Sequence, residues 1–276
     1  MKTRILTAIV ASAALLVVLF LPWPIAFTIA MSLVCAIAAG ELMNVTRAVA
    51  FRSLAAASVI FAAVVPFFHL LPSAVIFFAC LLYVVLAVQL YLRHHERLSL
   101  DLLCKAVLLT LLMSFGLSCA SFLRTTASRA DTDGLFYVML SMVIAWMADS
   151  GAYFVGTFFG KHKLCPNISP KKTVEGLVGG IASSMLFSLL SGWIYQVLVL
   201  QGGGAVSYWT IVVLAAVGAP LSVIGDLFAS LIKRSCGVKD FGKIFPGHGG
   251  MMDRFDSLML VFPLVYLTVR YLPIVY

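Results

Sequence analysis

Apolar runs of about 20 residues follow one another along nearly the whole 276-residue chain. A helix of about 20 predominantly apolar residues is long enough to cross the hydrocarbon core of a bilayer. The runs therefore predict an all-α fold, a polytopic transmembrane helical bundle with about nine spans. We expect these spans at residues 5–21, 24–40, 53–71, 73–92, 103–123, 135–159, 174–199, 208–232 and 255–273.

The composition excludes the main classes of soluble protein. Hydrophobic residues make up 62% of the chain and charged residues 11%, whereas a soluble domain is typically about 45–50% apolar and about 25% charged. We therefore exclude a soluble globular protein, a disordered chain and a nucleic-acid binder. The apolar runs also leave no room for a separate soluble domain of about 100 residues.

The positive charges predict the orientation in the membrane. With the N-terminus placed in the cytoplasm, 16 of the 19 Lys and Arg residues fall in cytoplasmic segments and three fall outside. This orientation, with the C-terminus outside, is favoured because cytoplasmic loops carry the excess of Lys and Arg. Residues 161–175 and 233–256 hold nine of the 19 basic residues, so we expect the functional site in these two cytoplasmic loops.

Two aspartates interrupt the apolar runs. Asp149 and Asp226 each have apolar residues on both sides, and a carboxylate at membrane depth costs about 3 kcal/mol and usually marks a functional site. A structural polar pair between helices is the alternative. Asp226, Ser230 and Lys233 are spaced i, i+4 and i+7, so they share one helix face, and Arg234 adjoins that face.

The segment 230–257 carries the strongest chemical signal. Three glycines, Gly247, Gly249 and Gly250, surround His248. Glycine adopts positive φ and lets backbone N–H groups approach phosphate oxygens closely. His248 has three open interpretations. It is a general base, a hydrogen-bond donor to a phosphate, or a loop residue that hydrogen-bonds only the backbone.

Two further aspartates, Asp253 and Asp256, lie at i, i+3 where the last span is expected to begin. Carboxylate oxygens suit Mg²⁺, which takes its other ligands from water and substrate phosphates. We expect Asp226 and Asp253 to assemble a Mg²⁺ site, with Asp256 near it. The alternative is that Asp253 is only the N-cap of the last helix.

The loop before residue 176 predicts an anion site at a helix start. Ser169 and Pro170 precede Thr173 and Glu175 in a pattern typical of a helix N-terminus, and Lys171 and Lys172 lie beside the free backbone N–H groups. A loop that binds lipid headgroups is the alternative.

Three smaller features complete the pattern. The pairs Gly156/Gly160 and Gly176/Gly180 predict close helix contacts. We expect His162 to be solvated and to have no carboxylate partner. Glu41, near the cytoplasmic end of the second span, has no role that the sequence assigns.

The segment from Ser230 to Asp256 resembles the signature of the phosphatidate cytidylyltransferases, the CDP-diacylglycerol synthases. The likeness is close over the C-terminal half, so we divide the chain into scaffold spans at residues 1–132 and a catalytic region at residues 133–276 with its signature at residues 230–257. The matching residues are Ser230, Lys233, Arg234, Lys239, Asp240, Gly242, Phe245, Pro246, His248, Gly249, Gly250, Met251, Asp253, Arg254, Phe255 and Asp256.

The resemblance implies a nucleotidyltransferase of phospholipid biosynthesis that condenses CTP with phosphatidic acid to CDP-diacylglycerol and pyrophosphate. It implies Mg²⁺ on Asp226, Asp253 and Asp256, with or without a second cation such as K⁺. The expected catalytic residues are Asp226, Asp253, His248, Lys233 and Arg234. The expected substrate-binding residues are Ser169, Lys171, Lys172, Thr173, Ser230, Lys239, Lys243, Gly249, Gly250, Arg254 and Asp149.

Two other functions remain open at this point. A CTP-dependent polyprenol or phytol kinase would release CDP instead of pyrophosphate, and an ion-coupled transporter would use Asp149 and Asp226 as an ion path. We expect an integral protein of a bacterial inner membrane, surrounded by membrane lipids, with its active site at the cytoplasmic face. A homodimer is left open.

Overall fold

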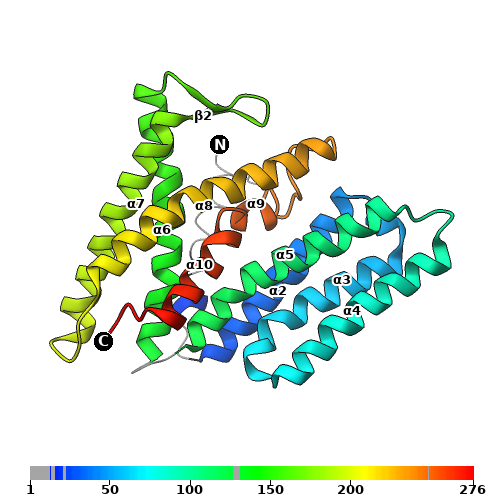
Figure 1. Cartoon of the computed structure of the whole chain (residues 1–276), viewed down its shortest axis with the longest axis horizontal. Coiled ribbons are helices and arrows are strands. Elements are labelled where there is room, and N and C mark those ends of the chain that lie inside the picture. The colour runs from blue at the N-terminus through cyan, green and yellow to red at the C-terminus, as the bar shows by residue number, and fades with distance from the viewer. Residues whose placement is uncertain (1–12, 14–15, 21–22, 127–130, 248) are drawn as a thin grey trace. The chain divides into compact units, whose positions relative to one another are not determined.

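The computed structural model describes residues 13, 16–20, 23–126, 131–247 and 249–276 (Figure 1). These residues are mostly helical, which confirms the all-α class. The sequence did not predict the two short strands, β1 (Lys163–Cys165) and β2 (Ser169–Thr173), which pair antiparallel. The 3₁₀ turn η1 (Ala48–Ala50) and the five-residue π turn η3 (Gln196–Leu200) are further short elements.

Within the described residues, seven helical segments are long and apolar enough to cross a membrane, as expected for an integral membrane protein. They are α2 (Pro24–Val45), α3 (Arg52–Val64) with its 3₁₀ extension η2 (Val65–Leu70), α4 (Ser73–His94), α5 (Leu100–Thr125), α6 (Asp131–Phe159), α7 (Val174–Tyr195) with η3, and α8 (Tyr208–Ser235). They confirm seven of the predicted spans. The expected span 5–21 lies largely outside the described residues.

The last expected span, 255–273, is wrong as a single helix. The chain forms a short helix α9 (Met252–Phe255), turns at Asp256 and Ser257, and then forms α10 (Leu258–Tyr271). The turn follows from a local hydrogen bond, because the Ser257 N–H donates to the Asp256 side chain at 2.8 Å. The 14 residues of α10 are fewer than the about 20 needed to span a bilayer.

The chain forms two compact units, each built from two stretches of sequence. The first unit comprises Met1–Phe122 and Ser235–Phe255, and the second comprises Leu123–Arg234 and Asp256–Tyr276. The predicted signature segment is therefore divided between the two units. The expected functional division at residue 132 stays a prediction.

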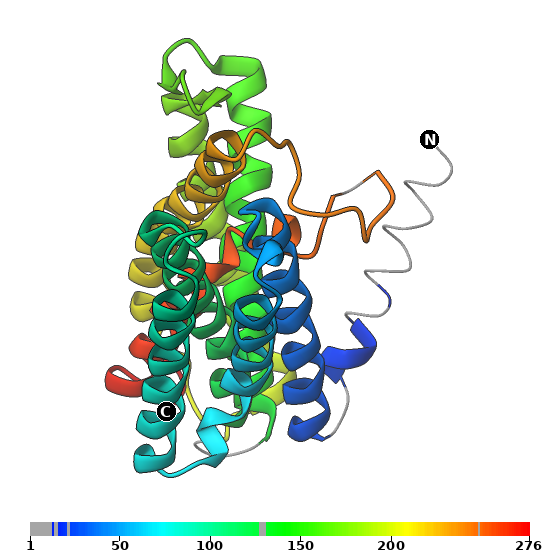
Figure 2. The same ribbon diagram turned by 90° about the vertical axis from the view of Figure 1, so that its right-hand side faces the viewer.

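The helices α3, α4 and α5 belong to the first unit (Figure 2), and aromatic packing holds them together. The Phe61 ring stacks on Tyr83 with centroids 4.4 Å apart, and Phe68 and Phe115 pack against the same cluster. The Tyr83 hydroxyl lies 2.9 Å from the Ser58 hydroxyl. This contact satisfies two polar groups that would otherwise be costly to bury.

Glycines bring α6 and α7 together in the second unit, where the two helices lie side by side (Figure 1). A Cβ on Gly176 would lie 2.8 Å from the Ala152 carbonyl oxygen, and a Cβ on Gly180 would lie 2.6 Å from the Ala148 carbonyl oxygen. On α6, a Cβ on Gly156 would lie 3.5 Å from the Gly176 Cα. These distances confirm the predicted close helix contacts at Gly156, Gly176 and Gly180, whereas Gly160 lies just after the end of α6 and beside Thr173.

Gly180→Ala should destabilise the protein in detergent by about 1–3 kcal/mol, because the added methyl meets backbone that cannot move aside. The matched control is Gly40→Ala in α2, where a Cβ meets nothing within 4 Å. We expect this control to be neutral or stabilising by up to about 1 kcal/mol. Thermal unfolding of the two purified variants measures the difference, and equal melting temperatures would contradict the proposed packing.

Candidate functional site

A cavity of about 270 Å³ opens in the second unit among α6, the β1–β2 hairpin, α7 and α8. Its volume is near the lower end of the range for small-molecule pockets, about 300–1,000 Å³. Its lining combines two carboxylates, two lysines and three hydroxyls with apolar side chains. The lining residues are Asp149, Ala152, Tyr153, Leu164, Ser169, Lys171, Lys172, Thr173, Gly176, Leu177, Val223 and Asp226.

An ion pair in the lining of this cavity joins the hairpin to α8. The Lys172 Nζ lies 2.6 Å from the Asp226 Oδ2, with 21% and 32% of the two side chains exposed. The ammonium group also lies 3.5 Å from the Val223 carbonyl oxygen. A pair this short at a partly buried position holds the lysine in one place, so Asp226 directs a positive charge into the cavity.

Carboxylates gather around the pair. Asp256 is 9% exposed, and its burial, together with the negative charges of Asp226 and Asp149, raises its pKa to about 7. The positive charge of Lys233 acts in the opposite direction. The turn at Asp256 lies close to α8, since a Cβ on Gly225 would lie 2.6 Å from the Asp256 carbonyl oxygen.

This donor set fits a hard cation. Crowded carboxylates repel one another, and a divalent cation bound between them removes that repulsion. No group of three or more His, Cys, Asp or Glu side chains in the described part of the chain is arranged to hold a metal ion. Mg²⁺ does not require such a group, because one or two carboxylates and substrate phosphates suffice.

The helix α8 confirms the shared face that was predicted for Asp226, Ser230 and Lys233, a row that we call the stripe. It continues unbroken from Tyr208 to Ser235, through Pro220, so Asp226, Ser230 and Lys233 lie on successive turns of one face. Arg234 is exposed at the end of this helix. The stripe therefore leads from the cavity to the end of α8.

The helix start predicted before residue 176 is confirmed as the cap of α7. The Thr173 Oγ1 accepts a hydrogen bond of 3.1 Å from the Gly176 N–H, as an N-cap does. The residues just before it, Ser169–Thr173, form the strand β2 rather than a loop. Strand pairing thus places Ser169, Lys171 and Lys172 along the cavity.

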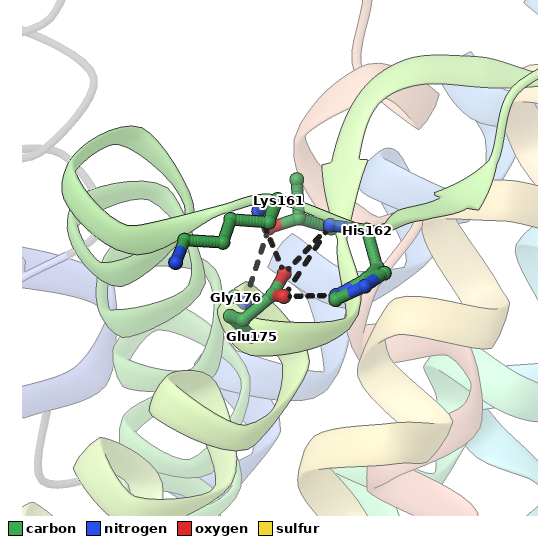
Figure 3. A network of polar contacts seen from close by, with 5 residues as sticks. Lys161, His162, Glu175 and Gly176 are labelled. Atoms are coloured by element: carbon green, nitrogen blue, oxygen red, sulfur yellow. Dashed lines mark hydrogen bonds and ion pairs between the residues drawn. The ribbon is translucent and has the colours of Figure 1, made fainter.

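The expectation that His162 has no carboxylate partner is wrong. Its Nδ1 lies 2.6 Å from the Glu175 Oε1, and the N–H groups of Lys161 and His162 donate to the same carboxylate at 3.1 to 3.3 Å (Figure 3). The sequence could not show this contact because the hairpin returns the chain to the start of α7. Glu175 thereby fastens the base of the hairpin that carries Lys172.

The first unit holds the rest of the predicted site. The expected phosphate-binding residues there are Lys239, Lys243, Gly249, Gly250 and Arg254, together with Asp253. His248 lies outside the described residues. The site expected from Asp226 together with Asp253 stays a prediction.

The glycines of this segment differ in backbone conformation. Gly247 and Gly249 have φ of 80° and 85°, which confirms the predicted left-handed backbone, whereas Gly250 does not have a positive φ.

The Asp253 Oδ2 accepts N–H bonds from Phe241 at 2.8 Å and from Gly250 at 2.9 Å. Asp253 lies inside α9 rather than before it, so the N-cap interpretation is wrong.

Sequence reasoning missed two contributors. Tyr153 lines the cavity but was not among the expected site residues, although it lies one turn after Asp149 on the same helix. Glu41 contacts the segment that carries Asp253. Its signal was a carboxylate among apolar residues, which marks a residue with a partner but does not name that partner.

Comparison with known proteins finds a matching family model and several similar proteins. The model of the Cytidylyltransferase family matches residues 2–272. The phosphatidate cytidylyltransferase of Staphylococcus saprophyticus is 42% identical over 134 residues, which are 49% of this chain and 49% of that protein. The phosphatidate cytidylyltransferase of Staphylococcus haemolyticus is 39% identical over 154 residues, 56% of each protein. The chain thus spans about half the length of the curated relatives it matches.

Proposed function

The chain belongs to the cytidylyltransferase family, and on this basis we propose that it transfers the cytidylyl group of CTP to phosphatidic acid. The products are CDP-diacylglycerol and pyrophosphate. Relatives about 40% identical to the chain bear the name phosphatidate cytidylyltransferase, which supports the choice of acceptor. The chain is therefore a nucleotidyltransferase of phospholipid synthesis in this proposal.

The observation that carries the proposal is the Lys172–Asp226 pair in the cavity of the second unit. Both substrates are highly anionic, so a site for them needs cations to bind phosphates and carboxylates to hold a divalent metal. The cavity offers both, because Lys171, Lys172, Asp149 and Asp226 all belong to its lining. A purely apolar lipid pocket would have no use for this arrangement.

The chemistry needs no covalent enzyme residue. A phosphate oxygen of phosphatidic acid attacks the α-phosphorus of CTP and forms the new P–O bond. The bond between the α-phosphorus and the oxygen that bridges it to the β-phosphate breaks, and pyrophosphate leaves with that electron pair. The protein must therefore align two anions and neutralise the charge on the leaving group.

Lys171, Lys172 and Ser169 bind phosphate oxygens, and the ion pair with Asp226 keeps Lys172 in place for this task. Ser230, Lys233 and Arg234 extend the positive stripe along α8. Asp226 and Asp256 would hold Mg²⁺, which supplies charge neutralisation and a template for the phosphates when bound. The participation of Asp253, His248 and a second cation such as K⁺ stays a prediction.

The location follows from the same charges. The apolar helices anchor the protein in the bilayer, and the positive-inside rule places the basic loops, and with them the site, at the cytoplasmic face. Phosphatidic acid then reaches the site from within the bilayer, so its acyl chains need not cross water. The bacterial relatives support an inner-membrane location.

The test is a product assay with the purified chain in detergent micelles that contain phosphatidic acid. With CTP labelled in the cytidine and with Mg²⁺, we expect label in a lipid product on thin-layer plates and one pyrophosphate per lipid formed. EDTA should abolish the reaction and excess Mg²⁺ should restore it. Absence of cytidine-labelled lipid under these conditions would refute the proposal.

The same assay separates the alternatives. A polyprenol or phytol kinase would transfer label from γ-labelled CTP to its lipid acceptor and release CDP. An ion-coupled transporter would move solute across liposomes and would leave CTP intact. Either result in place of pyrophosphate release would overturn the cytidylyl-transfer assignment.

A further inference from the structure

Glu41 joins the helix α2 to the loop before α9, within the first unit. Its Oε1 accepts a hydrogen bond from the Met251 N–H, and its Oε2 accepts one from the Met252 N–H, both at 2.9 Å. Glu41 is 6% exposed and lies in an apolar helix. A carboxylate buried in this way is tolerated when its charge is hydrogen-bonded, so the loop and Glu41 depend on each other.

Two glycines make room for this carboxylate. A Cβ on Gly242 or on Gly250 would collide with the Glu41 side chain. Neither glycine has a positive φ, so alanine could adopt both backbone conformations. The need for glycine at these two positions therefore comes from the space that Glu41 occupies.

A second carboxylate holds the same loop. The Asp253 Oδ2 accepts the N–H groups of Phe241 and Gly250, and Glu41 accepts the next two N–H groups along the chain. The three consecutive N–H groups of residues 250–252 are thus bound by two carboxylates. Asp253 and Arg254 follow directly after Met252, whose N–H group donates to Glu41.

We propose that Glu41 is a positioning residue: its carboxylate holds the backbone at Met251 and Met252 and thereby sets the positions of Asp253 and Arg254. What those two residues bind rests on the proposed function, whereas the loop contact does not. Glu41 does not touch substrate in this proposal. It acts through the loop, from a helix that the sequence analysis assigned to the scaffold spans.

Hydrogen exchange followed by mass spectrometry tests the contact directly. In Glu41→Ala, the amides of Met251 and Met252 should exchange at least about tenfold faster than in the unmodified chain. Glu41→Gln keeps the length and one acceptor oxygen, so we expect a smaller change. The control is Glu96→Gln, at an exposed glutamate of the same unit, which should leave the exchange of residues 241–255 unchanged. Unchanged exchange in Glu41→Ala would overturn the proposal.

A double-mutant cycle with Gly242→Ala gives an independent readout. In the unmodified background the added methyl collides with Glu41, so exchange in residues 241–252 should rise. In the Glu41→Ala background the space is vacant, and Gly242→Ala should increase the exchange rate by less than about twofold. An equal effect of Gly242→Ala in both backgrounds would contradict a loop built around Glu41.

Kinetics then separate positioning from a purely structural role. With turnover referred to folded protein, Glu41→Gln should raise the KM for CTP at least about fivefold and leave the KM for phosphatidic acid within twofold. A purely structural residue would lower the yield of folded protein without changing either constant, and that result would refute positioning. A chain that does not turn over CTP refutes the proposed function but leaves the exchange experiment valid, so the two failures are distinguishable.

Discussion

Asp226→Asn should reduce the proposed cytidylyl transfer by about 100-fold or more in kcat/KM, because it removes the carboxylate that holds Lys172 and, in the proposed site, Mg²⁺. The substitution keeps the size of the side chain but removes its negative charge. Lys172, whose Nζ lies 2.6 Å from the Asp226 carboxylate, loses its negatively charged partner, and the proposed cation loses a ligand. The measurement is steady-state turnover of CTP with saturating Mg²⁺ and phosphatidic acid.

The chain offers a matched control for this substitution. Asp101 forms an ion pair with Lys105 at the same 2.6 Å, but its side chain is 71% exposed. Exposed pairs contribute little, so Asp101→Asn should leave kcat/KM within about twofold. If Asp226→Asn retains more than half of the activity while it melts like the unmodified protein, the assignment of the cavity as the active site is wrong.

Asp253→Asn should also reduce activity by about 100-fold or more if Asp253 binds the cation, as the signature implies. Asparagine retains one oxygen that can accept the N–H groups of Phe241 and Gly250, but it carries no charge. Asp253→Ala removes both the charge and the acceptor. The pair of variants therefore separates the charge of Asp253 from its hold on the loop.

The two functions of Asp253 predict different results. If both variants lose activity alike, while only Asp253→Ala accelerates hydrogen exchange in residues 241–252, then the charge is what catalysis needs. If Asp253→Asn keeps normal activity and only Asp253→Ala loses it, then Asp253 is a loop anchor and the metal assignment is wrong. Asp101→Ala serves as the control for side-chain removal at an exposed aspartate.

The features that were predicted correctly are local in sequence. The spans follow from apolar runs, the start of α7 follows from Thr173 and its neighbours, and the α8 stripe follows from the helical period. Each depends on residues within one or two turns of one another, where hydropathy, capping and side-chain spacing act. The break at Asp256 was missed because an acidic residue is equally compatible with the first turn of a helix.

The residue types at the site were also readable from the sequence, but their partners were not. Asp149, Lys172 and Asp226 were all expected at the site, yet nothing in the sequence paired Lys172 with Asp226. For His162, the same kind of reasoning wrongly excluded a partner. Ion pairs between separate elements depend on how those elements pack, and the spacing of charges along the chain does not encode that packing.

The amino-acid order alone therefore established a helical membrane protein with charged loops, because bilayer crossing and helix periodicity are local properties. Tertiary structure decided which of those charges meet. Glu41 and Met251 are 210 residues apart, and only the folding of the first unit brings the carboxylate to those N–H groups. Contacts over such distances arise from the packing of whole helices, so a short stretch of sequence does not predict them.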